Sequence, residues 1–326
     1  MRAAIYERTG PASEVLRVTE LPDPEPGRGE VRVRVCVAAV NPTDWKARLG
    51  FPGRPMPFSR QTPGQDGAGE IDAVGAGVDP TRLGETVWVY HAADGRPSGT
   101  AAEYVVVPAE QAVQLPEGVS LDQGAALGIP FLTAHRCLFA DGSIDGAHVL
   151  VAGGAGAVGN AAIQLAKRAG TQVITTVSSE AKAKLAREAG ADEVVVDYTR
   201  ADAGAEIGAW APAGVDRILE LALGANLELD LEVLASGGTI VTYATEHTEP
   251  QLPVGRLLRQ NVRLLFMLVY ATPPHALRQG VREITDALVE GALRPLPALR
   301  FALDEIVAAH EAGERGETGK VLIELP

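Results

Sequence analysis

The sequence predicts an α/β protein with two domains, a β-rich N-terminal domain followed by a doubly wound parallel sheet. Strands punctuated by turns occupy about the first 120 residues, and strand and helix patterns alternate from residue 147 onward. Such alternation is typical of a parallel sheet with helices on both faces. The length of 326 residues agrees with two domains of about 150 residues each.

The β-rich part is indicated by period-two patterns. Valines alternate with more polar residues over residues 31–38, as in a strand with one apolar face. Further strands, separated by glycines and prolines, are predicted over residues 69–74, 85–90 and 102–107. This arrangement favours a small irregular barrel.

The second part alternates in the order that a parallel sheet requires. Strands are predicted over residues 148–151, 172–177, 193–196, 215–221 and 239–243. Helices are predicted between them, over residues 158–169, 180–189 and 226–234. Residues 262–269 predict an outer strand, in which Phe266 is expected to be a core residue. An apolar strand at the edge of a sheet is prone to pair with another chain unless another part of the protein or a second subunit covers it.

Composition excludes several classes of protein. Hydrophobic residues make up 46% and charged residues 22%, so the chain is not intrinsically disordered. Its net charge of −13 opposes nucleic acids and anionic lipids as partners. No apolar run approaches the ~18 residues of a membrane span. The only cysteines, Cys36 and Cys137, form no disulfide framework, and we expect a cytoplasmic protein.

A glycine loop carries the strongest chemical signal. Residues 153–159 read GGAGAVG, so Gly154, Gly156 and Gly159 satisfy the G-x-G-x-x-G pattern between a strand and an amphipathic helix. Glycines let the backbone approach a pyrophosphate, and the helix N-terminus offers it unpaired N–H groups. The loop therefore predicts a dinucleotide cofactor.

The end of the next predicted strand, residues 172–177, indicates which dinucleotide is bound. NAD-binding proteins usually carry an acid there, about 20 residues on, for the ribose 2′-hydroxyl. This chain has Ser178 and Ser179 instead, with Lys182 one turn later. Hydroxyls and an ammonium suit a 2′-phosphate, so we predict NADPH. Lys182 as a solvated surface lysine remains the alternative, and Glu180 is expected to face outward.

Six segments in order resemble the medium-chain dehydrogenase/reductase superfamily, in particular its zinc-free quinone oxidoreductase branch, which includes zeta-crystallin. They are residues 38–44 (AAVNPTD), 62–78 (TPGQDGAGEIDAVGAGV), 98–108 (SGTAAEYVVVP), 125–135 (AALGIPFLTAH), 149–170 (the glycine loop and its helix) and 313–324 (GERGETGKVLIE). The resemblance covers nearly the whole chain.

The resemblance implies a GroES-like barrel over residues 1–122, completed by about 290–326, and a Rossmann domain over 123–289, with a cleft between them. It implies that Asn41 and Thr133 lie near the nicotinamide. It also implies a homodimer formed through residues 264–270.

The resemblance further assigns the rest of the cofactor site. It implies that Gly156, Ala157 and Val158 cradle the pyrophosphate, and Gly154 and Gly159 are further expected cofactor-binding residues. The adenosine 2′-phosphate would meet Ser178, Lys182 and Tyr198, and Tyr243, Arg315 and Lys320 complete the expected cofactor-binding residues.

The departures from zinc-dependent relatives are informative. Such relatives carry Cys where this chain has Val40-Asn41, and Gly-His-Glu where it has Gly64-Gln65-Asp66. Because a catalytic zinc needs several N, S or O ligands, no metal is expected.

Without zinc, the protein must work by positioning a hydride donor and acceptor. The expected function is NADPH-dependent reduction of a quinone or an α,β-unsaturated carbonyl compound, a small-molecule substrate. Charge would build on a carbonyl oxygen and need a donor. The candidate catalytic residues are Asn41, Asp44 and Tyr90, and for Asn41 a purely structural role in its loop is the alternative.

Two other functions remain open. Enoyl reductases of biosynthetic, polyketide-type intermediates resemble the chain, but commonly carry a tyrosine in the loop where this chain has Phe51, which cannot donate a proton. Tyr90, Tyr243 or water would then serve. A non-catalytic NADPH-binding role is the third reading, because a fold does not prove catalysis.

Overall fold

The computed structural model describes residues 1–51, 53–244 and 250–326. The chain divides into two compact units, the first formed by Met1–Ile129 and Pro295–Pro326 and the second by Pro130–Arg294. Among the described residues, no helix has the length and apolar character that crossing a membrane requires.

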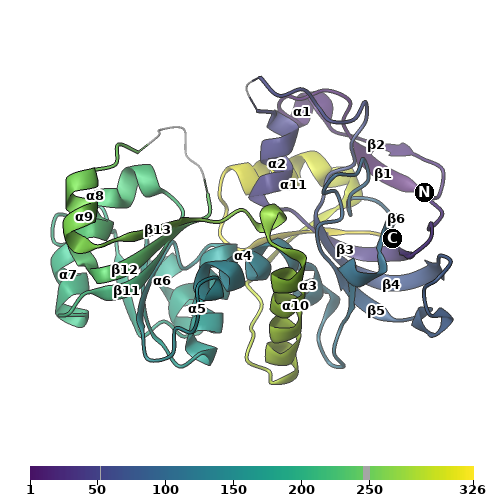
Figure 1. The fold of residues 1–326 in the computed structure, drawn as a ribbon. Coiled ribbons are helices and arrows are strands. Elements are labelled where there is room, and N and C mark those ends of the chain that lie inside the picture. The colour runs from purple at the N-terminus through teal and green to yellow at the C-terminus, as the bar shows by residue number, and fades with distance from the viewer. Residues whose placement is uncertain (52, 245–249) are drawn as a thin grey trace. The chain divides into compact units, whose positions relative to one another are not determined.

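The first unit is built on antiparallel strands, apart from one parallel pair at its edge (Figure 1). The main sheet runs in the order β14-β15-β3-β4-β5-β7, and β6 also pairs with β3. Its strands are β3 (Glu30–Ala39), β4 (Asp66–Val74), β5 (Thr86–Val89), β6 (Tyr104–Pro108), β7 (Ala112–Gln114), β14 (Ala298–Ala302) and β15 (Lys320–Glu324). A separate pair joins β1 (Arg2–Ile5) to β2 (Arg17–Glu20).

The alternation along β3 explains how this sheet covers its core. Val31, Val33 and Val35 are buried, while Arg32 and Arg34 pair with Asp72 and Glu70 on β4. One strand therefore supplies core side chains on one face and cross-strand ion pairs on the other.

Short helices complete the first unit. They are α1 (Ala12–Val15), α2 (Pro42–Leu49), α3 (Leu121–Ala125) and α11 (Ile306–Glu314), with 3₁₀ turns η1 (Pro80–Arg82), η2 (Ala109–Gln111) and η4 (Leu303–Glu305). Helix α2 begins with a capping box: Asn41 is the N-cap, and Asp44 accepts a hydrogen bond from the Asn41 backbone at 2.7 Å. Pro42 stands at the first helical position, where no N–H is needed.

The second unit contains a parallel sheet of six strands in the order β10-β9-β8-β11-β12-β13. The strands are β8 (His148–Ala152), β9 (Gln172–Val177), β10 (Glu193–Val196), β11 (Val215–Glu220), β12 (Leu234–Thr242) and β13 (Arg263–Phe266). Numbered along the chain, this is the order 3-2-1-4-5-6 of the doubly wound dinucleotide-binding fold. The predicted fold class is confirmed.

Helices alternate with these strands (Figure 1). They are α4 (Gly128–Phe139), whose first two residues belong to the first unit, α5 (Ala157–Arg168), α6 (Glu180–Glu188), α7 (Ala203–Trp210), α8 (Leu223–Val233), α9 (Val254–Gln260) and α10 (Pro274–Val289), with the turn η3 (Val269–Ala271). Side chains of α7 and α8 share one core with Leu150, Ile174 and Ile218 of the sheet.

The outer strand differs from its prediction. β13 covers only Arg263–Phe266, and Phe266 is 69% exposed, so its expected place in the core is wrong. β13 is the last strand of the sheet and has a strand neighbour on only one side. Its apolar side chains are therefore only partly covered.

Candidate functional site

The glycine loop joins β8 to α5 and is fastened to the neighbouring strand. The amides of Gly153 and Gly154 both donate to the Thr176 carbonyl on β9, at 3.0 and 3.2 Å. The Gly156 amide donates back to the Gly153 carbonyl at 2.9 Å. The loop is therefore a tight turn held at the carboxyl edge of the sheet.

Two of the loop glycines are required by close contacts. A Cβ on Gly154 would lie 2.2 Å from Thr175 Oγ1, and one on Gly159 would lie 2.3 Å from the Gly153 carbonyl oxygen. Neither position has room for any other residue without movement of its neighbours. The pattern thus serves strand–helix packing as well as ligand approach.

The start of α5 offers unused donors. Gly156 is its N-cap and makes no side-chain cap, and Asn160 makes the first helical hydrogen bond, to the Gly156 carbonyl at 2.8 Å. The amides of Ala157, Val158 and Gly159 precede that bond. Free amides and the positive end of the helix dipole at a glycine turn fit a pyrophosphate.

Residues expected at the adenosine end lie at the same edge of the sheet. Ser178 follows β9, Tyr198 follows β10, and the Asp197 amide donates to the Val177 carbonyl at 2.9 Å. Lys182 Nζ donates to Ser178 Oγ at 3.0 Å, and the chain between them turns into α6 through the N-cap Ser179. The structure therefore brings Ser178 and Lys182 together.

Two further expected cofactor residues belong to the second unit. Thr133 is buried on α4. Tyr243 follows β12, its amide donates to the Glu220 carbonyl at 3.3 Å, and burial raises the pKa of its phenol. Glu246 and His247, in the next segment, lie outside the described residues.

The first unit holds a buried polar cluster formed by Asn41, Asp66 and Lys320. Asn41 Nδ2 donates to Asp66 Oδ2 at 2.8 Å, and Lys320 Nζ donates to Asn41 Oδ1 at 2.6 Å. The Ile129 amide donates to the same Asp66 oxygen at 2.8 Å. The Asn41 side-chain amide thus bridges a buried cation and a buried carboxyl.

Burial controls the ionisation of this cluster. Asp66 is 0% and Lys320 4% exposed. Desolvation lowers the pKa of Lys320, opposed by Asp66 and Asp44. Desolvation raises the pKa of Asp66 to about 6, opposed by Lys320 and by the hydrogen bonds from Ile129 and Asn41.

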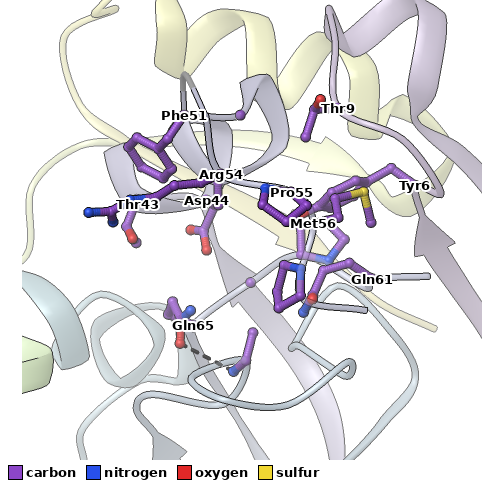
Figure 2. A pocket seen from close by; sticks show the side chains of 16 residues that line it. Tyr6, Thr9, Thr43, Asp44, Phe51, Arg54, Pro55, Met56, Gln61 and Gln65 are labelled. Atoms are coloured by element: carbon purple, nitrogen blue, oxygen red, sulfur yellow. Dashed lines mark hydrogen bonds between the residues drawn. The ribbon is translucent and has the colours of Figure 1, made fainter. Parts of the chain in front are cut away.

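Asp44 connects this cluster to a pocket. It is 4% exposed, and desolvation raises its pKa to about 7; the Asn41 amide lowers that pKa, Asp66 raises it, and Lys320 lowers it. Asp44 lines a pocket of about 260 Å³ in the first unit, shown in Figure 2. A carboxyl with this pKa is available as an acid near neutral pH.

The pocket is mostly apolar, with a few polar groups. Its walls include Tyr6, Phe51, Met56 and Gln65 (Figure 2). The pKa of Tyr6 rises to about 12, chiefly through burial and then through the charge of Asp44. Sequence reasoning missed Tyr6 because no motif marks the end of β1, and only the fold brings it beside α2.

Three candidate residues have other contacts. The Asn41 side chain makes its hydrogen bonds to Asp66 and Lys320 inside the cluster. Tyr90 is buried, its hydroxyl donates to the Glu110 carbonyl at 3.3 Å, and it is not among the residues lining this pocket. Arg315 forms ion pairs with Glu311 and Glu317.

The histidine, cysteine and acidic side chains form no candidate metal site among the described residues. Over residues 1–51, 53–244 and 250–326, no three His, Cys, Asp or Glu side chains gather in a way that could hold an ion. Gln65, at the position where zinc-dependent relatives carry histidine, accepts a hydrogen bond from the Ala93 amide at 3.2 Å.

Two family models match the chain. One, described as an alcohol dehydrogenase GroES-like domain, matches residues 27–117, and the other, described as a zinc-binding dehydrogenase, matches residues 157–286. The quinone oxidoreductase of Mus musculus is 31% identical, over 100% of this chain and 98% of that protein. These matches confirm the predicted fold class and the predicted family.

Solved structures agree with this assignment. The quinone oxidoreductase from Thermus thermophilus, also solved with NADPH, is 31% identical with a TM-score of 0.82, and each chain is covered completely. A protein described as an NAD-dependent alcohol dehydrogenase is 30% identical with a TM-score of 0.88, again with complete coverage.

The loop geometry yields a prediction about stability. Gly159→Ala places a methyl group against the Gly153 carbonyl, so the free energy of unfolding should fall by about 2 kcal/mol, as in an overpacked core. Gly208→Ala is the control: a Cβ there meets nothing within 4 Å, and alanine in helix α7 should stabilise by up to about 1 kcal/mol. Urea denaturation measures both, and equal effects would contradict the packing argument.

Proposed function

Because this chain belongs to the quinone oxidoreductase family of the medium-chain dehydrogenase/reductases, we propose that it is an NADPH-dependent reductase. Its hydride acceptor is a quinone or an α,β-unsaturated carbonyl compound, and the reaction proceeds without zinc. The observation that carries the proposal is the glycine turn with its uncovered amides, followed at the next strand end by Ser178 and Lys182.

The second unit would hold the cofactor. The amides of Ala157, Val158 and Gly159 bind its pyrophosphate, because they are donors at the positive end of α5. Ser178, Lys182 and Tyr198 bind the 2′-phosphate, and Thr133 and Tyr243 contact the remainder. When bound, NADPH supplies a hydride.

Selection of NADPH over NADH rests on the end of β9. An acid that would bind the ribose hydroxyl is replaced by Ser178, and Lys182 supplies a positive charge within hydrogen-bond distance of it. The solved NADPH complex of the Thermus relative supports this choice. The relative described as NAD-dependent makes a side-by-side comparison of both cofactors the necessary test.

The pocket beside Asp44 would hold the substrate. Reduction of an enone requires a hydride at the β-carbon and a proton at the α-carbon or the carbonyl oxygen. The Asp44 carboxyl is the proton source, since its pKa of about 7 leaves a protonated fraction at neutral pH. Tyr6, protonated at all ordinary pH values, donates a hydrogen bond to the oxygen on which charge develops.

Asn41 and Lys320 support Asp44 in this proposal. The Asn41 backbone amide orients the Asp44 carboxylate at 2.7 Å. Lys320 holds Asn41 in place and opposes the rise of the pKa of Asp44. They act as positioning residues, and Asp44 regains its proton from solvent after each turnover.

A homodimer through β13 is part of the proposal. Phe266 and Leu268 are 69% and 62% exposed, at the edge of the parallel sheet. An open edge with apolar side chains is a liability unless it is covered. A second copy of the same strand would pair with it and bury these residues.

The cofactor test compares NADPH with NADH in the presence of benzoquinones, enones and acyl thioesters. We expect turnover with NADPH and little with NADH. Lys182→Gln should raise the KM for NADPH about tenfold through loss of a charged hydrogen bond, and leave the KM for NADH unchanged. Lys184→Gln, on the same helix but paired with Glu188, should change neither.

Several outcomes of this test would overturn the proposal. Turnover confined to acyl thioesters would favour a biosynthetic enoyl reductase. Binding of NADPH with no turnover of any acceptor would favour a non-catalytic role. Preference for NADH would refute the phosphate site while leaving the reductase reading intact.

The proton source predicts a pH dependence. The acid form of Asp44 is lost as pH rises through about 7, so kcat/KM should fall about tenfold per unit above that pH. In the Asp44→Asn variant the side-chain oxygen still accepts the hydrogen bond from the Asn41 amide. The variant should nevertheless lower kcat about 100-fold, and the fall of kcat/KM above pH 7 should disappear.

A matched control separates this effect from helix capping. Asp79 accepts the Thr81 amide at 2.9 Å in the turn η1, as a cap away from the pocket. Asp79→Asn should leave the pH profile unchanged. An Asp44→Asn variant that keeps the wild-type pH profile would exclude Asp44 as the proton source.

A further inference from the structure

Arg54 is a charged side chain at the pocket with no counter-ion. It is exposed and lines the pocket in the segment after α2, where its backbone amide donates to the Phe51 carbonyl at 3.0 Å. Among the residues that the structure describes, no carboxylate lies within ion-pair distance of its guanidinium, and the guanidinium donates to no other side chain. Figure 2 shows Arg54 with Phe51, Thr43 and Asp44 at the pocket.

Two other arginines of the first unit, Arg48 and Arg96, have partners. Arg48, on α2, pairs with Glu314 and donates to the Gly10 carbonyl. Arg96 donates to the carbonyls of His91 and Ala92 and to Gln111. Arg54 therefore differs from Arg48 and Arg96 in keeping its donors available.

The surrounding sequence strengthens the positive potential. Residues 51–60 contain Arg54 and Arg60 and no acidic residue, in a chain of net charge −13. A cation without a counter-ion attracts an anion more strongly beside an apolar wall, because the low dielectric constant there screens its charge less. The apolar neighbours Phe51, Pro55 and Met56 form such a wall.

The pocket carries charge at two positions. Asp44 is buried and Arg54 is exposed, and no other lining residue is Asp, Glu, Lys, Arg or His. An anionic group on a bound molecule would be repelled by ionised Asp44 and attracted by Arg54. A molecule with an anionic end is therefore oriented with its uncharged, reducible part toward Asp44.

We infer that the preferred substrate is an α,β-unsaturated carbonyl compound that also carries a carboxylate, held by the Arg54 guanidinium. A guanidinium binds a carboxylate through two parallel hydrogen bonds, which fixes orientation as well as affinity. The volume of about 260 Å³ suits a single ring with a short chain. This inference rests on the proposed reductase function and specifies the substrate for the same pocket.

The test uses a matched pair of enones, 4-oxo-4-phenylbut-2-enoate and its methyl ester, which differ in the charge of one end. With NADPH, Arg54→Gln should lower kcat/KM for the acid about tenfold, as expected for one charged hydrogen-bonded contact that is partly exposed to solvent. For the ester, kcat/KM should change less than twofold. Arg54→Lys should recover part of the loss, since it keeps the charge without the planar fork.

Arg60→Gln is the matched control. It removes the same charge from the same segment at a residue that does not line the pocket, and should leave the ratio of acid to ester within twofold of wild type. If Arg60→Gln lowered kcat/KM for the acid as much as Arg54→Gln does, long-range attraction would explain the effect, and the proposed contact with Arg54 would be refuted. An unchanged ratio in Arg54→Gln would also overturn it.

A binding measurement separates this inference from the proposed function. The saturated acid 4-oxo-4-phenylbutanoate is titrated calorimetrically into wild type and Arg54→Gln, with its methyl ester as reference. Binding of the acid that weakens about tenfold in the variant supports the anion contact even if no enone is turned over, in which case only the reductase assignment fails. Equal affinity of both proteins for the acid refutes the contact, whatever the turnover.

Discussion

The buried ammonium of Lys320 is the constraint on which the first unit depends. A lysine that is 4% exposed incurs a large desolvation penalty, and is tolerated because Asn41 and the Val40 carbonyl accept its hydrogen bonds. Asn41 in turn donates to Asp66. The three residues begin β15, precede α2 and begin β4, so one polar contact joins the end of the chain to its first third.

The orientation and the pKa of the Asp44 carboxyl depend on this cluster. The capping box that starts α2 fixes the Asp44 carboxyl against the Asn41 amide, and burial beside Asp66 and Lys320 sets its pKa near neutrality. The residue that completes the capping box of α2 is thereby the acid of the pocket in the proposed reaction. Glycines also have two roles in the second unit. They allow α5 to pack against the sheet, and they leave the amides of the first turn of α5 accessible to a ligand.

The fold followed from patterns in the sequence because period-two alternation and strand–helix alternation are local. The glycine loop, Ser178 and Lys182 could be placed at one sheet edge because parallel strands end together. Contacts across the chain were not predictable: no pattern in the sequence indicates that Lys320 Nζ lies 2.6 Å from Asn41 Oδ1. Tyr6 and Arg54 carry no motif, and Phe266 was misplaced because an edge strand leaves its apolar side chains open.

Isotope transfer tests the central claim most directly. The protein would reduce 4-oxo-4-phenylbut-2-enoate in ordinary water with NADPH dideuterated at C4, and the mass and the proton NMR spectrum of the product would be measured. We expect one deuterium at the carbon β to the ketone, with the second new hydrogen taken from water. A product without cofactor deuterium would contradict hydride transfer and, with it, the proposed function.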